Sequence, residues 1–192
     1  MRTTFTLDDD AEEERPAVGD SGNAWRAQGV GAADQGHDRR VGLRPAHGSH
    51  LLDVNALIAL LWENHEFHDT MAAWFARHAR AGWATCAITQ SGFVRVMSQR
   101  AVPKPGRSVA GSAEVLANNL SHPAHQRLAL NFHFTDVVTC CTGGVVDHRQ
   151  VTDAYLLTAA VRAGMKLLTF NTGVGTLLAS DSERKAYLLP SG

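Results

Sequence analysis

After residue 50 the chain alternates short apolar runs with longer segments of helical periodicity, and this alternation limits the folds open to it. The runs at 50–55, 83–89 and 166–170, "HLLDVN", "WATCAIT" and "KLLTF", predict strands, and 56–62, "ALIALLW", predicts the start of a helix. Strands separated by helices pair in parallel, because each helix returns the chain to the end of the sheet where the previous strand began. The expected fold class is therefore an α/β sandwich around a mostly parallel sheet.

The remaining elements follow from the same periodicities. We expect helices at 66–82, 90–99, 108–120, 152–164 and 174–179, and strands at 134–139 and 185–190. Thr152 is the candidate N-cap of the helix at 152–164, and Gly164 stands at its C-terminal end.

Residues 1–49 differ from the rest. They are rich in Gly, Ala, Arg and Asp, have no Ile and show no sustained period of 2 or 3.6, which predicts a disordered extension. Residues 1–10 alternate at Phe5 and Leu7 and could form a short strand. No apolar run reaches the length of a membrane span and the acidic start is unlike a signal peptide, so we expect a cytoplasmic protein without membrane contact.

Charge and cysteine content exclude several classes. A net charge of −1 argues against a surface coated for nucleic-acid binding, although the region after residue 49 has a small basic surplus that permits RNA binding. Cys86, Cys140 and Cys141 lack C-x-x-C spacing, which favours free thiols. His65 and His68 have ligand-like spacing, but no carboxylate or cysteine cluster accompanies them, so a zinc site is not expected.

Three polar side chains fall at ends of the predicted elements. Asp53 follows the first strand, Asp153 lies in the first turn of a helix, and Asn171 follows the strand at 166–170. Ligands of parallel sheets gather beyond the carboxyl ends of the strands, and two carboxylates suffice for a minimal Mg²⁺ or Mn²⁺ site. The alternative is that Asp53 caps a helix and Asp153 complements a helix dipole.

Four stretches, in this order, resemble the VapC-type toxins of the PIN-domain family. They are "LLDVNALIALLWENHEFH", "TCAITQSGFVRVMS", "HRQVTDAYLLTAAVRAGMKLLTF" and "NTGVGTLL". The resemblance implies that residues 50–192 form a PIN-like α/β/α sandwich with the activity of a metal-dependent endoribonuclease toxin. It further implies that Asp53 and Asp153 bind Mg²⁺ or Mn²⁺, with Asn55 as a polar companion.

Two positions depart from the pattern of that family. Gln90 stands where many members have Glu, and Asn171 stands where they have Asp, so two negative charges are missing. A site with fewer carboxylates holds a cation more weakly. Asp136 and Asp147 are the nearby acids, but nothing in the pattern assigns either to the site. The alternative function is thus a catalytically weakened or inactive PIN domain that binds its antitoxin without cutting RNA.

Further expectations concern the partners of the chain. Arg95, His148 and Arg149 are candidate contacts to RNA phosphates, because Arg suits bidentate phosphate binding. The resemblance implies a cognate VapB-type antitoxin whose amphipathic helix covers the metal cleft, and a homodimer through the helices of residues 55–80. A third interpretation is an unrelated α/β fold with chance motifs, which a structure without parallel α/β content would favour.

The stretch "MRTTFTLDDD" resembles the opening strand of ribbon-helix-helix antitoxins, after which the likeness stops. Two interpretations are open: residues 1–49 are an antitoxin remnant fused to the toxin, or a frameshifted read-through into the toxin frame.

Overall fold

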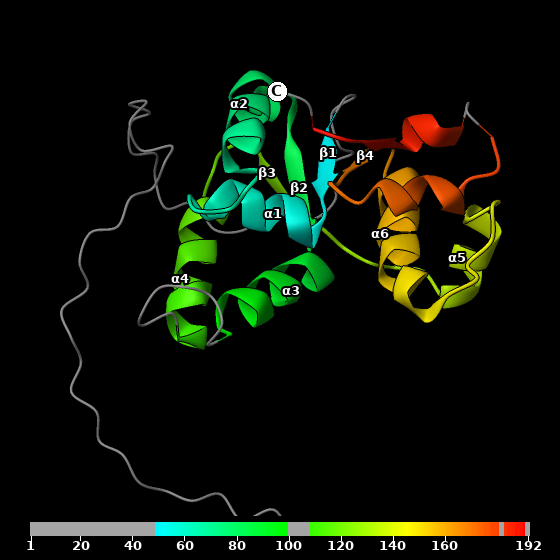
Figure 1. The fold of residues 1–192 in the computed structure, drawn as a ribbon, viewed down its shortest axis with the longest axis horizontal. Helices are drawn as coiled ribbons and strands as arrows, with labels where there is room; N and C mark the ends of the chain where they lie inside the picture. The colour runs from blue at the N-terminus through cyan, green and yellow to red at the C-terminus, as the bar shows by residue number, and fades with distance from the viewer. Residues whose placement is uncertain (1–48, 100–107, 181–182, 191–192) are drawn as a thin grey trace, which may run out of the picture. The chain divides into compact units, whose positions relative to one another are not determined.

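The structure, a computed structural model, describes residues 49–99, 108–180 and 183–190 (Figure 1). The predictions made for residues 1–48 lie outside these ranges.

A parallel sheet forms the centre of the described part of the chain (Figure 1). Its strand order is β3-β2-β1-β4-β5, and each neighbouring pair is parallel. This confirms the predicted α/β class with a mostly parallel sheet. The strands are β1 (His50–Leu52), β2 (Trp83–Cys86), β3 (His125–Leu128), β4 (Lys166–Leu168) and β5 (Tyr187–Leu188).

Helices connect the strands. The α-helices are α1 (Val54–Leu61), α2 (His68–His78), α3 (Ala87–Met97), α4 (Val109–Leu120), α5 (Phe134–Cys140) and α6 (Val151–Arg162). Short 3-10 helices are η1 (Ala79–Ala81), η2 (His148–Gln150), η3 (Thr172–Leu177) and η4 (Glu183–Ala186).

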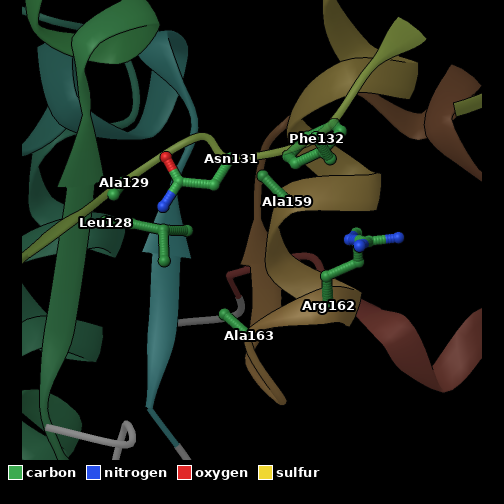
Figure 2. A pocket seen from close by; sticks show the side chains of 7 residues that line it. All are labelled: Leu128, Ala129, Asn131, Phe132, Ala159, Arg162 and Ala163. Atoms are coloured by element: carbon green, nitrogen blue, oxygen red, sulfur yellow. The ribbon is translucent and has the colours of Figure 1, made fainter. Parts of the chain in front are cut away.

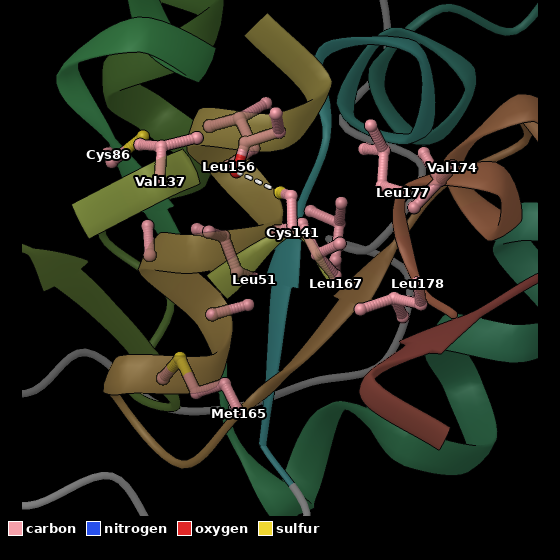
Figure 3. Close-up of a cluster of buried hydrophobic side chains, with 14 of the residues drawn as sticks. Leu51, Cys86, Val137, Cys141, Leu156, Met165, Leu167, Val174, Leu177 and Leu178 are labelled. Carbon is pink, nitrogen blue, oxygen red and sulfur yellow. Dashed lines mark hydrogen bonds between the residues drawn. The ribbon is translucent and has the colours of Figure 1, made fainter. Parts of the chain in front are cut away.

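The helices cover both faces of the sheet, because successive side chains of a strand point to opposite faces. Leu51 packs in a core with α5, α6 and η3, part of which Figure 3 shows. Leu52, the next residue, packs in a second core with α1 to α4. Figure 1 shows α1 to α4 on one side of the strands and α5 and α6 on the other. The result is a three-layer α/β/α sandwich.

One predicted strand is wrong. Residues 134–139 form helix α5, not a strand. Phe134, Val137 and Val138 have helical i, i+3, i+4 spacing, and the carboxylate of Asp136 accepts a hydrogen bond from the backbone N–H of His133 at 3.1 Å. The capping interaction outweighs the strand preference of the β-branched residues.

Strand β3 was not predicted. Its sequence "HQRL" lacks apolar alternation because it is an edge strand, paired only with β2 among the described strands. Helix α6 starts at Val151 with Gln150 as its N-cap, so the prediction of Thr152 as N-cap is wrong by two residues. Gly164 ends this helix with φ +70°, as predicted, a conformation that glycine adopts readily.

The cysteines behave as free thiols. Cys86 and Cys141 are buried in the core of α5 and α6, and Cys140 is partly exposed. The Cys141 thiol points to the carbonyl of Ala154 (Figure 3).

Candidate metal centre

Asp53 lies buried, 5% exposed, at the carboxyl end of the central strand β1. Its backbone N–H donates to the carbonyl of Leu168 at 2.9 Å, which continues the pairing of β1 with β4. Its carboxylate Oδ1 accepts from the N–H of Val54 at 2.6 Å, so Asp53 is also the N-cap of α1. The capping role thus exists beside the role as a candidate ligand.

Thr169, directly after β4, fixes the other oxygen of Asp53. The Thr169 hydroxyl donates to Asp53 Oδ2 at 2.7 Å and accepts from Asn55 Nδ2 at 3.2 Å and from the Asn171 backbone N–H at 3.0 Å. A hydroxyl has one proton and two lone pairs, so these three bonds saturate it. Asp53 is therefore held as an acceptor. Thr169 was not predicted as a site residue, although it lies two residues before the candidate site residue Asn171.

Asn55 joins the same two strand ends. Its Oδ1 accepts from the backbone N–H of Phe170 at 3.1 Å. Since Asn55 is in the first turn of α1, this bond ties that turn to the segment after β4. Asn55 contacts the residues that hold Asp53 rather than Asp153.

Asp153 lies in the first turn of α6 and is partly buried. Its Oδ2 accepts from Asn171 Nδ2 at 2.7 Å. Asn171 Oδ1 accepts from the backbone N–H of Gly173 at 2.9 Å, which makes Asn171 the N-cap of η3. Because a backbone N–H can only donate, this bond sets the amide orientation, and Asn171 turns its NH₂ group to Asp153.

The two carboxylates affect each other electrostatically. Burial raises the pKa of Asp53. Burial, and then the negative charge of Asp53, raise the pKa of Asp153 to about 6, while the Asn171 hydrogen bond opposes this. Within the described ranges, no Lys, Arg or His forms an ion pair with either carboxylate. Among the described residues, these two acidic side chains are thus poorly solvated and have no ion-pair partner.

This donor set fits a hard divalent cation. Mg²⁺ and Mn²⁺ take carboxylate oxygens and complete their shell with water and substrate phosphate. An open pocket of roughly 450 Å³ provides that room. It is lined by Val146, Asp147, Arg149, Gln150, Asp153, Asn171 and Gly173. No group of three or more His, Cys, Asp or Glu side chains that could hold a metal occurs in the described part. The two candidate carboxylates are linked through Thr169 and Asn171.

The other candidate residues lie at varying places. Gln90, on α3, donates from Nε2 to Thr85 Oγ1 at 2.9 Å, and Thr85 bonds His125 at 2.9 Å. Gln90 therefore bonds β2 and has no hydrogen bond to Asp53 or Asp153 among the described contacts. Arg95 is exposed in the last turn of α3.

His148 and Arg149 flank Asp153 on the N-terminal side. Both pair with Asp147, at 3.2 Å for His148 and 2.8 Å for Arg149, and Arg149 and Asp147 line the pocket of Asp153. Asp136 instead caps α5 and does not line that pocket.

A second hollow, of roughly 170 Å³, lies between β3 and α6 (Figure 2). Arg162 stands over the ring of Phe132 at 5.5 Å. The lining residues include no carboxylate, so this hollow lacks ligands for a hard cation. No helix in the described ranges has the length and apolar character needed to cross a membrane.

Comparisons with known proteins identify the family of the chain. Residues 50–175 match the family described as PIN domain. The chain is 42% identical over 139 residues to Ribonuclease VapC38 and 40% identical over 138 residues to Ribonuclease VapC44, both of Mycobacterium tuberculosis. Each match covers 72% of this chain and 96% of the relative. The fold is similar to that in the crystal structure of VapBC2 from Rickettsia felis bound to a DNA fragment from their promoter, with a TM-score of 0.51, 12% identity, and coverage of 73% of this chain and 96% of the other. The chain therefore belongs to the VapC-type branch of the PIN-domain family.

Proposed function

We propose that the chain is a metal-dependent endoribonuclease toxin of a type II toxin–antitoxin system, which hydrolyses RNA phosphodiesters. The observation that carries this proposal is the hydrogen-bonded link between two carboxylates: Thr169 donates to Asp53 and accepts from the Asn171 backbone, and the Asn171 side chain donates to Asp153, which lines an open pocket. The names of the relatives, Ribonuclease VapC38 and VapC44, support the reaction class.

Asp53 and Asp153 would hold Mg²⁺ or Mn²⁺. A bound cation would lower the pKa of a water for attack on the phosphodiester and neutralise charge on the phosphate. Asp53 supplies a fixed oxygen, because Thr169 and Val54 already orient its carboxylate. Asp153 supplies an oxygen that faces the pocket, where RNA would enter.

Arg149 would contact an RNA phosphate. It lines the pocket of Asp153, and a guanidinium group forms charge-assisted hydrogen bonds to phosphate oxygens. His148 would add a weaker contact, and Arg95 lies on another helix and would bind RNA farther along the strand.

We infer that the partner is a small VapB-type antitoxin, which would lay an amphipathic helix over the pocket. The similarity in fold to VapBC2 from Rickettsia felis supports this inference. We further propose a homodimer through the helices of residues 55–80, a cytoplasmic location, and a PIN domain that spans residues 50–192. Co-elution of the chain with the product of the adjacent upstream frame in size-exclusion chromatography tests the partner, and separate elution would contradict it.

The experiment for the proposed activity is cleavage of total RNA and tRNA by the purified full chain with Mg²⁺ or Mn²⁺. We expect cutting that EDTA abolishes and that Asp53→Asn or Asp153→Asn lowers by at least about a hundredfold, because each change removes a carboxylate that binds the cation. Asp69→Asn, an exposed acid in the first turn of α2, is the matched control and should cut like the wild type. Folded protein that cuts no RNA with either cation would favour the inactive, antitoxin-binding alternative.

A further inference from the structure

The loop at 142–150 is attached to η3 across the pocket of Asp153. The carboxamide of Gln150 makes the central connection. Its Oε1 accepts from the backbone N–H groups of Val146, at 2.9 Å, and Asp147, at 3.1 Å, and its Nε2 donates to Thr176 Oγ1 at 3.1 Å. Both acceptor positions of the amide thus bind the loop, while a donor position binds the facing helix.

A second attachment lies at Gly143. Its N–H donates to the carbonyl of Leu177 at 2.9 Å. A Cβ built at this position would lie 2.3 Å from the carbonyl oxygen of Thr176, so only glycine allows the backbones to approach this closely. Residues near both ends of the loop, Gly143 and Gln150, are therefore bonded to η3.

The attached loop carries Arg149 in a defined orientation. Asp147 Oδ1 accepts from the Arg149 backbone N–H at 2.8 Å, and Asp147 Oδ2 accepts from Arg149 Nη2 at 2.8 Å and from Nε at 3.3 Å. The Nε and Nη2 edge of the guanidinium thus faces Asp147. Nη1 forms no hydrogen bond among the described residues, and it is available for a phosphate oxygen in the pocket shared with Asp153.

We propose that Gln150 is a positioning residue that sets the distance between the Arg149 guanidinium and the Asp153 carboxylate. It acts by joining the backbone of Asp147, which orients Arg149, to Thr176 on the helix that Asn171 caps. Arg149 would then contact the backbone phosphate next to the one that is cut. This inference rests on the proposed function.

The test measures binding of a single-stranded oligoribonucleotide to the full chain in EDTA, across a salt series, so that no RNA is cut. Arg149→Ala should weaken binding about threefold to tenfold and lower the salt dependence by one phosphate contact, about 0.7 in the logarithmic slope. Gln150→Met, similar in size but without hydrogen bonds, should reproduce most of both changes. In the double variant, Gln150→Met should add almost nothing to Arg149→Ala, because it acts through Arg149.

Two variants separate positioning from folding. Thr176→Val removes the bond from Gln150 and the bond that the Thr176 hydroxyl donates to the carbonyl of Gly173 within η3, and it leaves the bonds of Gln150 within its own loop. It should lower the salt slope as Gln150→Met does. Gln99→Met, on an exposed residue after α3, and Thr135→Val, on an exposed position of α5, are the matched controls and should bind as the wild type.

The proposal is overturned if Gln150→Met and Arg149→Ala lower affinity additively, if Gln150→Met and Thr176→Val leave the salt slope unchanged, or if the wild-type chain does not bind the oligoribonucleotide. Failure of the proposed function has a different result. If the binding pattern holds but no RNA is cut with Mg²⁺ or Mn²⁺, the positioning role stands and the nuclease assignment fails.

Discussion

The two carboxylates of the candidate metal centre are held in opposite ways. Asp53 is buried, and each of its carboxylate oxygens accepts a hydrogen bond. The donors are the backbone N–H of Val54 and the Thr169 hydroxyl, whose hydrogen-bonding capacity is already filled. Asp153 faces an open pocket and is held through one side-chain bond, from Asn171. The Asp53 half is thus part of the framework of the fold, whereas the Asp153 half can respond to a cation or to substrate.

The largest effect that would sharpen this contrast is expected at Thr169. Thr169→Val keeps the shape but leaves the buried Asp53 carboxylate and the Asn55 amide without their partner, which should lower the free energy of unfolding by about 3 kcal/mol. Thr169→Ser retains the hydroxyl and should cost less than about 1.5 kcal/mol. Urea denaturation in EDTA measures both. A smaller loss for Thr169→Val than for Thr169→Ser would show that the methyl group, not the hydroxyl, matters.

A second test compares the carboxylates directly. Asp53→Asn should destabilise the metal-free protein by about 1–3 kcal/mol, since an NH₂ group would face either the Val54 N–H or the Thr169 hydroxyl proton. Asp153→Asn should be neutral or stabilise the protein by up to about 1 kcal/mol, because it removes the repulsion between two anions. Denaturation in EDTA provides both values, and a larger loss in Asp153→Asn would reverse the assignment of the two halves.

The smallest effect concerns Asn171. Asn171→Asp exchanges a hydrogen-bond donor for an anion beside Asp153, so the metal-free protein should lose about 1 kcal/mol. The same variant should bind Mn²⁺ more tightly than the wild type, because it adds a carboxylate. Thermal denaturation with and without Mn²⁺ measures both effects. A variant that is stabilised in EDTA would show that Asn171 does not donate to Asp153 in solution.

The contrast also explains what sequence could predict. Asp53 and Asp153 stand at element ends that periodicity locates, because apolar runs such as "HLLDVN" mark the buried strands. Strand β3 lies at the sheet edge, where burial imposes no apolar pattern, so its polar sequence was not assigned. Helix α5 was predicted as a strand because its sequence is rich in β-branched residues, and the capping interaction that favours the helix was not recognised.

Hydrogen-bond partners were harder to predict than element ends. Thr169 reaches Asp53 across 116 positions of sequence, and only the pairing of β1 with β4 brings them together. The orientation of the Asn171 amide depends on the N–H of Gly173. The hydrogen bond that Gln150 donates depends on the placement of Thr176. These contacts depend on tertiary packing, which local periodicity does not predict.

Mn²⁺ binding to the full chain tests directly whether Asp53 and Asp153 form a metal centre. Electron paramagnetic resonance would measure this binding for the wild type, Asp53→Asn, Asp153→Asn and the control Asp69→Asn. We expect the wild type and Asp69→Asn to bind Mn²⁺ with the same affinity, and each of the other two variants to bind it at least about tenfold more weakly. Undiminished binding in both Asp53→Asn and Asp153→Asn would contradict the assignment of these carboxylates as the metal centre.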